Sequence, residues 1–380
     1  MSQDFGHALC NEWLFQKDLT FLNHGAYGAV PRPVLSAQHS WREELERQPV
    51  NFINNRLEAM LHDAAKDLAT FVGASPDALV FVSNSTEGAN AAIKSVEIGP
   101  GDVVVTTDQA YQGVVNALLK LCRSTGARLN IAKLPWPAFS ADQIVDVVEA
   151  TLGPRVRLVV LDHVSSKGAI LMPIERLVGC CRKIGIPVLV DGAHAVGMTA
   201  LNTESVKADW YVGSCHKWFC APKGCAFLTV SEEQKLKTHP TVTSTGYQKG
   251  FWKEFSWIGI RDPSPWLAVT AALKFWKDLG VASARSYMNK LADWAGDELV
   301  NKWGTERVAS TCLTGAMVTV RVPQSSRCDP FTAENFHDHL LRCHRIEVPV
   351  FTHDGELWVR VSTHVYNSEV DIELLASAIN

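Results

Sequence analysis

The sequence lacks the features that mark membrane, secreted and nucleic-acid-binding proteins. It has no stretch of about 18 apolar residues that could span a membrane. The opening MSQDFGHALC does not have the basic-then-apolar order of a signal peptide. The 36 basic and 40 acidic residues form no long run of one sign and leave a net charge of -4, which argues against nucleic acid and membrane partners. We therefore expect a cytoplasmic protein.

Motifs of metal and dinucleotide sites are missing as well. Ten cysteines in 380 residues do not make a disulfide framework, and neither CxxC nor HExxH is present to suggest zinc. No GxGxxG follows the first predicted strand, which disfavours a nicotinamide dehydrogenase. We expect free thiols in a reducing compartment and no metal site.

Short β-rich runs recur through the middle of the chain. They are LVFVS at 79–83, DVVVTT at 102–107, RLVVLDHV at 157–164, IPVLVDGAHA at 186–195, DWYVGS at 209–214 and CAFLTV at 225–230. Helical patterns lie between many of them, and this alternation predicts an α/β fold with a doubly wound, mostly parallel sheet. Ligands bind such sheets at the carboxyl ends of the strands.

The chain after Pro265 has a different character. A helical pattern, WLAVTAALKFWKDL, leads into MVTVRV at 317–322 and ELWVRVS at 356–362, which predict a smaller α+β domain. Pro263 and Pro265 mark the clearest break. We predict an N-terminal segment that contributes to the small domain, a large cofactor-binding domain and a small C-terminal domain, at residues 1–50, 51–285 and 286–380.

Two positions near strand ends carry candidate chemistry. Lys217 lies in GSCHKWFCAPKG among small and aromatic neighbours, where burial would lower the pKa of its amine and make it nucleophilic. Most lysines are solvated surface charges, so Lys217 alone indicates little. Asp191 closes IPVLVDGAHA at the ligand-binding edge, where a carboxylate can keep a pyridine nitrogen protonated. Its ordinary alternative is a helix cap.

A third motif, SNSTEGAN at 83–90, follows a strand and opens a helix with Ser85 and Thr86. The free amides of a helix N-terminus bind phosphate, although Ser or Thr with Glu nearby is also a common helix start. A lysine, a carboxylate and a phosphate site are what pyridoxal phosphate needs, because its protonated ring is the electron sink for a substrate carbanion.

These motifs in this order (strand-NSTEG-helix, DGAHA, SCHKW) resemble the class V aminotransferase family, in its isopenicillin N epimerase-like and hercynylcysteine sulfoxide lyase-like branch. The resemblance runs from LNHGAYGAVP at 22–31 to WVRVSTHVYNSEVDIELL at 358–375. It implies the type I fold of pyridoxal-phosphate-dependent transferases, the aspartate-aminotransferase-like fold. It also implies pyridoxal 5'-phosphate as cofactor, carried by Lys217 as a Schiff base.

The resemblance further implies roles around the cofactor. Tyr111 in DQAYQG would stack on the ring, Asp191 would pair with the ring nitrogen, and His194 would contact the phenolic oxygen. Gln109 stands where a histidine is frequent in this ring-stacking motif. The cofactor phosphate would be held by Ser85, Thr86, Ser214 and His216.

On the substrate side, Arg360 resembles the clamp for the α-carboxylate, a task that suits a planar, bidentate cation. A surface strand arginine is the alternative. Ser166 lies near the place where desulfurases carry asparagine. Further residues on this side would be Asn23, His24 and Gly25.

The segment WIGIRDPSPW at 257–266 resembles a loop that reaches the phosphate of a partner subunit, which implies a homodimer with active sites at the interface. Ile260 stands where relatives usually carry a threonine. The loss of that hydrogen bond would cost about 1 kcal/mol.

The motifs leave the reaction open. In this family the substrate amine displaces the lysine, which is then free to take the α-proton. Reprotonation on the opposite face gives an epimer, expulsion of a β-substituent a lyase, and proton transfer to the cofactor an aminotransferase. The loop VPVFTHDGELWVR before Arg360 holds no thiol, which disfavours a persulfide-forming desulfurase. Cys343 lies before the predicted strand, and core packing is the ordinary role for Cys328.

We favour an enzyme that performs β-elimination on cysteine or a cysteine-derived thioether or sulfoxide, because this needs one base and a good leaving group. Lys217 would be the base, and Tyr111 would assist the leaving group. An amino-acid epimerase or racemase that pairs Lys217 with Tyr111 or His353 fits nearly as well, and an aminotransferase is a further alternative. A non-catalytic binding protein of the same fold is motivated only by the departures at Ile260 and Gln109.

Overall fold

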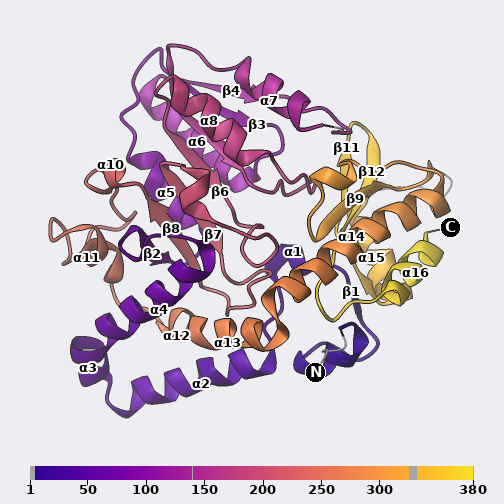
Figure 1. Cartoon of the computed structure of the whole chain (residues 1–380), viewed down its shortest axis with the longest axis horizontal. Coiled ribbons are helices and arrows are strands. Elements are labelled where there is room, and N and C mark those ends of the chain that lie inside the picture. Colours follow the sequence, from indigo (N-terminus) through magenta and orange to yellow (C-terminus); the bar gives the residue numbers. More distant parts are fainter. Residues whose placement is uncertain (1–4, 139, 325–331, 380) are drawn as a thin grey trace.

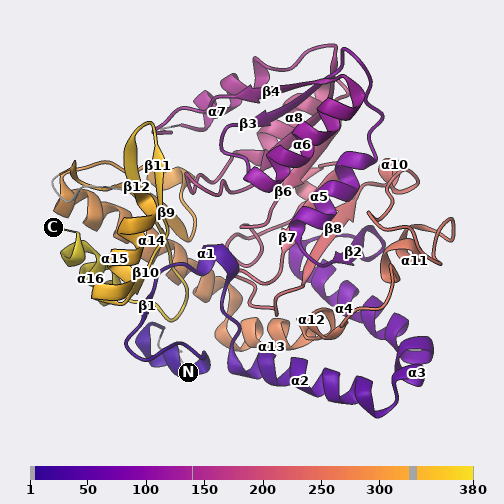
Figure 2. The same cartoon turned by 180° about the vertical axis from the view of Figure 1, so that it is seen from behind.

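The computed structural model describes residues 5–138, 140–324 and 332–379, and Cys328 lies outside them. A large sheet covered by helices stands beside a smaller sheet that carries its own helices (Figure 1). The same arrangement is seen from behind, with α1 (His24–Tyr27) between the two parts (Figure 2). None of the helices in the described residues is both long and apolar enough to cross a membrane.

The large sheet has seven strands in the order β2-β8-β7-β6-β5-β3-β4. Only β8 runs antiparallel to both of its neighbours, so the predicted mostly parallel, doubly wound sheet is confirmed. The sequence patterns did not predict β4, because this edge strand is largely exposed and has no apolar run. The strands are β2 (Leu79–Val82), β3 (Val103–Thr107), β4 (Arg128–Ala132), β5 (Val156–Asp162), β6 (Val188–Asp191), β7 (Trp210–Ser214) and β8 (Ala226–Val230).

Alternate residues of each strand enter two separate cores. In β6, Leu189 packs into one core, and Val188 and Val190 pack into the other. The Leu189 side is covered by α5 (Ser85–Lys94) and α6 (Gln112–Thr125). The opposite side is covered by α4 (Leu57–Val72), α7 (Ala141–Glu149), α8 (Ile174–Lys183) and α13 (Val269–Leu279). Burial on both faces is the reason that these strands are apolar almost throughout.

The small sheet is antiparallel and has the order β11-β12-β9. Its strands are β9 (Met317–Arg321), β11 (Val350–His353) and β12 (Glu356–Ser362). A third core joins it to α14 (Val281–Trp303), α15 (Ala333–His344) and α16 (Glu369–Ala378). Because α14 is continuous through residue 285, no break in secondary structure marks the boundary predicted there.

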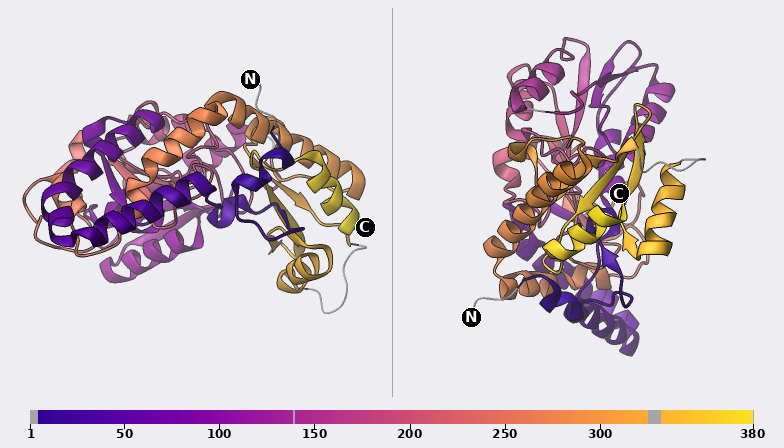
Figure 3. Two further views of the ribbon diagram at one scale, coloured as in Figure 1. Left: turned by 90° about the horizontal axis from the view of Figure 1, so that it is seen from below. Right: turned by 90° about the vertical axis from the view of Figure 1, so that its right-hand side faces the viewer.

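The N-terminal segment connects the two parts. Its β1 (Thr20–Phe21) pairs with β10 (Ile346–Glu347) beside the small sheet, and α2 (Arg32–Arg47) then packs on α12 (Ser264–Leu267) and α13 (Figure 3). The remaining short helices are η1 (His7–Glu12), α3 (Pro49–Asn51), η2 (Phe52–Arg56), η3 (Pro76–Ala78), α9 (Thr203–Val206), α10 (Glu232–Lys235), α11 (Phe251–Ser256) and η4 (Thr311–Leu313).

Candidate active site

Polar side chains gather at the carboxyl ends of the central strands. Asp162, Asp191 and Ser214 are the last residues of β5, β6 and β7, and Asp162 pairs in register with Asp191. Side chains at this edge line a cavity of about 550 Å3. The lining includes the predicted residues Gly25, Ser85, Thr86, Tyr111, Asp191, His194, Ser214, His216, Lys217 and Arg360.

The Lys217 amine lies inside this cavity. Its Nζ is 3.2 Å from Nε2 of His194. The pKa of the Lys217 amine is lowered to about 8, mainly by burial; the Asp191 carboxylate opposes this shift, and the nearby Arg360 cation adds to it. Burial also holds the pKa of His194 well below its usual value, so this imidazole is neutral at physiological pH. Lys217 therefore keeps a substantial neutral fraction near pH 8.

Two buried carboxyl groups face the amine. Asp191 Oδ1 accepts a 2.9 Å hydrogen bond from the Ala193 amide, and burial raises the pKa of the Asp191 carboxyl. A Cβ on Gly192 would lie 2.1 Å from the Tyr211 hydroxyl oxygen, so only glycine fits directly after Asp191. Burial and the neighbouring Asp191 raise the pKa of Asp162 well above its usual range, and its Oδ2 has no hydrogen-bond partner among the described residues.

Asp162 is a cavity residue that was not predicted from the sequence. Its signal is the same as that of Asp191, because it closes an apolar strand, RLVVLDHV, at the ligand-binding edge. The cavity lining also includes Asn84, Tyr27 and Ser166.

The first turn of α5 lies at the cavity. Asn84 caps the helix by accepting a 2.8 Å bond from the Glu87 amide, and Glu87 in turn accepts a 2.7 Å bond from the Ser83 amide. Capping is therefore the work of Asn84, which leaves Ser85 and Thr86 to line the cavity. The amides of a first helical turn lack intrahelical acceptors and carry positive potential, so this end can hold an anion.

Two further residues adjoin that helix end. The Ser214 hydroxyl lies 3.2 Å from the hydroxyl of Ser85. His216 Nδ1 is 3.4 Å from the Cys225 carbonyl oxygen, and burial lowers the pKa of His216 to about 4. The hydroxyls of Ser85, Thr86 and Ser214 therefore offer neutral hydrogen-bond donors around a site whose positive potential comes from the helix, while the single ring proton of neutral His216 is directed to the Cys225 carbonyl.

Arg360 reaches the cavity from β12 of the small sheet. Its Nη1 donates a 2.5 Å bond to the Ser166 carbonyl, and its buried Nε has no partner among the described residues. Burial lowers the pKa of Arg360 to about 10, so the guanidinium stays charged at neutral pH. A buried cation with an unpaired N–H can receive a carboxylate.

The structure does not bring Asn23 and His24 to the cavity. The His24 ring is fully buried, with Nδ1 2.8 Å from the Tyr366 hydroxyl and Nε2 3.1 Å from the Lys217 carbonyl oxygen. Asn23 Nδ2 instead donates to Glu347 at 2.7 Å. In α1, which begins at His24, the residues that line the cavity are those that follow, from Gly25 to Tyr27.

Other predicted positions lie at the rim or beyond it. Tyr111 and Tyr27 line the cavity with half or more of their surface exposed, and Ile260 is 74% exposed outside it. The His353 ring centroid lies 4.0 Å from that of Trp136, and His353 is not part of the lining. Gln109, which stands where related sequences often carry a histidine, is buried.

Comparisons with known proteins place this chain among enzymes. The model of the family described as aminotransferase class-V matches residues 21–375. An isopenicillin N epimerase of Amycolatopsis lactamdurans is 34% identical over 95% of this chain and 94% of its own length. An L-cysteine desulfhydrase of Arabidopsis thaliana is 30% identical over 96% of this chain and 88% of its own. The solved structure of the cystine C-S lyase C-DES with cysteine persulfide superposes with a TM-score of 0.83 and 19% identity, covering 96% of this chain and 97% of that one.

Proposed function

Because the chain belongs to the class V aminotransferase family, we propose that it is a pyridoxal-phosphate-dependent lyase that cleaves the β-carbon–sulfur bond of cysteine or a cysteine-derived amino acid. The observation that carries the proposal is one cavity in which a lysine amine with a pKa of about 8 faces a buried carboxylate and a buried guanidinium. The names of the desulfhydrase and C-S lyase relatives support the carbon–sulfur bond as the target.

The residues present fit the three polar parts of the cofactor, which are its phosphate, its ring nitrogen and its phenolic oxygen. The first turn of α5 suits the phosphate, because Asn84 takes over the capping and leaves Ser85 and Thr86 to the cavity. Asp191 is a buried carboxylate at a strand end, as a pyridine nitrogen requires. The buried Nδ1 of His194 has no partner among the described residues, so His194 retains a polar atom for a ligand.

Each residue would hold one part of the reacting molecules. Bound in the cavity, the cofactor would supply an electron sink for negative charge at the substrate α-carbon. Arg360 would orient the substrate by its carboxylate through charge-assisted hydrogen bonds. Lys217 would remove the α-proton, because its neutral form is accessible near pH 8. His194, 3.2 Å from the amine, would keep Lys217 directed into the cavity.

Tyr111 is the residue that would protonate the departing sulfur. It is the residue directly before α6, lines the cavity, and has half of its surface exposed at the rim. A hydroxyl there could reach a side chain that projects towards the entrance. A variant Tyr111→Phe should therefore lower kcat more for a poor leaving group, such as a thioether, than for a sulfoxide.

We also propose that the enzyme is a homodimer in the cytosol. Tyr27 and Tyr111 expose large surfaces at the cavity rim, and Ile260 is an exposed apolar side chain; a second copy would cover them. The cysteines of the described residues are free, as expected in a reducing compartment. Molar mass by light scattering tests the dimer, and a monomeric enzyme with full activity would contradict it.

The decisive experiment measures spectra and products together. Purified protein should gain a visible absorption band when pyridoxal phosphate is added, and Lys217→Ala should not. With L-cysteine the wild type should release pyruvate and sulfide in equal amounts. Accumulation of D-cysteine would instead favour an epimerase, the activity in the name of one relative. A wild type without the band would overturn the proposal.

A further inference from the structure

Three consecutive backbone carbonyls of the loop that carries Lys217 are held from the side opposite the cavity. Each accepts a hydrogen bond from an aromatic ring N–H that comes from a distant part of the chain. We name His24, His364 and Trp276 the ring clamp. The bonds run from His24 Nε2 to Lys217 O at 3.1 Å, from His364 Nε2 to Trp218 O at 3.3 Å, and from Trp276 Nε1 to Phe219 O at 3.1 Å.

The loop is buried and irregular, and the carbonyls of Trp218 and Phe219 rely on side-chain donors. The Lys217 carbonyl also accepts a 2.8 Å bond from the Cys220 amide within the loop, so His24 is its second donor. Residues 215–221 lie between β7 and β8 and outside any helix or strand. Buried carbonyls outside regular structure must find partners elsewhere. Cys220 adopts a φ of 65°, a left-handed conformation that a non-glycine residue keeps only where its surroundings hold it. The ring clamp is part of those surroundings.

The two histidines of the clamp are suited to act as neutral donors. His24 Nδ1 lies 2.8 Å from the Tyr366 hydroxyl, which can donate to it and thereby leave the proton on Nε2. Burial holds the pKa of His24 well below its usual value and lowers that of His364 to about 4. The two rings are stacked, with centroids 4.1 Å apart.

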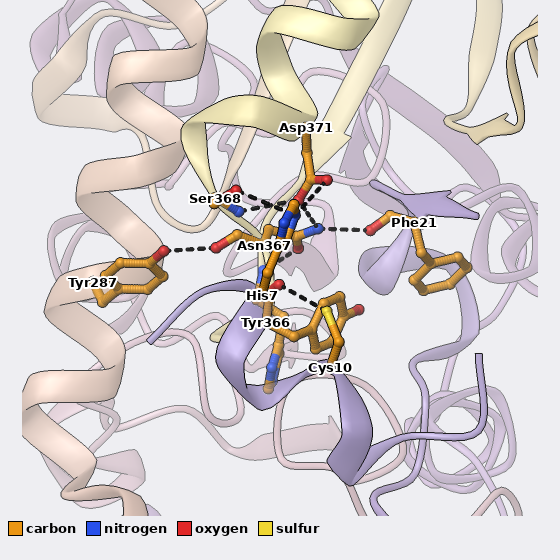
Figure 4. A network of polar contacts seen from close by, with 9 residues as sticks. His7, Cys10, Phe21, Tyr287, Tyr366, Asn367, Ser368 and Asp371 are labelled. Atoms are coloured by element: carbon orange, nitrogen blue, oxygen red, sulfur yellow. Dashed lines mark hydrogen bonds and ion pairs between the residues drawn. The ribbon is translucent and has the colours of Figure 1, made fainter. Parts of the chain in front are cut away.

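The backbone of His364 is held by a polar network around Asn367, which Figure 4 shows between the N-terminal segment, α14 and the segment after β12. Asn367 is its centre: its Oδ1 accepts from the His364 amide at 2.9 Å, and its Nδ2 donates to the Phe21 carbonyl at 3.0 Å. The Tyr287 hydroxyl of α14 donates to the Asn367 carbonyl at 2.6 Å. The N-terminal segment, α14 and the chain after β12 therefore meet behind Lys217.

The two histidines of the ring clamp, together with Cys220, are also a possible set of metal ligands. His24, Cys220 and His364 are buried, with ligand atoms within 4.8 Å of one another. Both imidazole Nε2 atoms, however, already face backbone carbonyls, and the Cys220 thiol lies 3.4 Å from the Trp218 carbonyl. Burial also raises the pKa of the Cys220 thiol far from the thiolate form that a metal needs. Hydrogen bonding accounts for these contacts without an ion.

We propose that His24 and His364 are positioning residues, which hold the peptide carbonyls of Lys217 and Trp218 so that the lysine amine stays aligned in the cavity. The inference rests on the proposed function of Lys217. His24 directly precedes the lining residue Gly25, and His364 follows Arg360 by four positions. The segments that shape the cavity thus also fix the lysine from behind.

The test compares variants that differ in one donor. His24→Phe and His364→Phe keep a ring but lose the N–H, whereas His24→Gln and His364→Gln place an amide N–H at a similar distance. Trp303→Phe is the matched control, because it removes a buried ring donor to the Ala376 carbonyl far from Lys217. Each holoenzyme is measured for kcat, KM, melting temperature and the position of its visible band.

We expect the Phe variants to lower kcat roughly 10- to 100-fold, the cost of a small misplacement of a catalytic group, with little change in KM. Their visible band should shift, and the Gln variants should restore both properties. Trp303→Phe should lower the melting temperature alone. If the Phe variants do not fold, His24→Asn, whose amide is too short to reach the Lys217 carbonyl, takes their place against His24→Gln.

Two results would overturn the inference. One is that the Phe variants behave as Trp303→Phe does, losing stability but not kcat. The other is one zinc ion per chain in the purified wild type, lost together with activity in all four histidine variants. A wild type that gains no visible band with pyridoxal phosphate would instead reject the proposed function itself, so the two failures are distinguishable.

Discussion

The two sides of the Lys217 loop are built from opposite kinds of contact. On the cavity side lie ionisable groups with unpaired atoms, such as Asp162 Oδ2 and Arg360 Nε. On the back, neutral rings pair with the carbonyls of the loop one by one. A buried polar atom without a partner costs stability, whereas a satisfied network adds rigidity. The cavity side therefore keeps its hydrogen-bonding capacity for ligands, and the back keeps the loop in place.

This difference between the cavity side and the back of the loop predicts different effects for substitutions on the two sides. Changes on the cavity side should remove catalysis and leave the fold intact or more stable. Changes on the back should reduce stability wherever a carbonyl loses its donor, and those at His24 and His364 should also lower kcat, because these two residues position Lys217. A cavity-side variant that loses stability would show that the two sides are not independent.

The largest effect is expected at the amine itself. Lys217→Ala removes the proposed base, and kcat should fall by up to about 10⁴-fold, the upper range for general base catalysis. The melting temperature of the cofactor-free protein should not fall, because a half-buried amine next to the Arg360 cation is removed. Steady-state kinetics and calorimetry measure the two quantities. Strong destabilisation would mean that Lys217 belongs to the structural side.

The next effect concerns the substrate carboxylate. Arg360→Met should raise KM for L-cysteine roughly 10- to 100-fold, since a hydrogen bond to a charged group contributes about 1.5–3 kcal/mol. Cysteamine, which lacks the carboxylate, provides the control: its binding, measured by competition, should be the same in wild type and variant. An equal loss for both compounds would place Arg360 in the architecture of the cavity instead.

A third prediction concerns charge on the cavity side alone. In cofactor-free protein the reactivity of Lys217 towards an acylating reagent should rise with pH through a midpoint near the pKa of about 8, because only the neutral amine reacts. Arg360→Met removes a repelling cation and should move the midpoint up. Asp191→Asn removes a stabilising anion and should move it down. Labelling at several pH values, read by mass spectrometry, checks both signs.

Shifts in the same direction for both variants would contradict this electrostatic account. The back of the loop supplies the control, because Trp276→Phe adds or removes no charge and should leave the midpoint where it is. A shift in Trp276→Phe would show that the pKa of Lys217 depends on the position of the loop as well as on the neighbouring charges.

The cavity side was largely predictable from the sequence. Asp191 and Ser214 close apolar strands, Lys217 lies three residues after β7, and parallel strands bring their carboxyl ends to one edge. The same rule applied to RLVVLDHV would have found Asp162. The large sheet followed from the same runs, apart from β4, whose exposed residues carry no apolar pattern. The short strands β1, β10 and β11 were not predicted, and β11 lies in the segment VPVFTHDG that was expected to be a loop.

The back of the loop was not predictable in this way. His24 was expected beside the substrate with Asn23 and Gly25, but the direction of a side chain on a single helical turn depends on tertiary packing. His364 and Trp276 come from segments 146 and 57 residues away from the carbonyls that they contact. Local patterns contain no signal for such contacts, because the donor ring and the accepting carbonyl share no spacing rule.

The smallest effect should be found at Trp276, the third member of the ring clamp. Trp276→Phe keeps an aromatic ring but leaves the Phe219 carbonyl without its donor, which should cost about 1–3 kcal/mol of stability. Since that carbonyl lies two residues beyond Lys217, and the carbonyls of Lys217 and Trp218 keep their histidine donors, kcat should be almost unchanged. Urea unfolding and steady-state kinetics measure the pair. A kcat loss as large as that of His24→Phe would show that the loop moves as one rigid unit and is not held residue by residue.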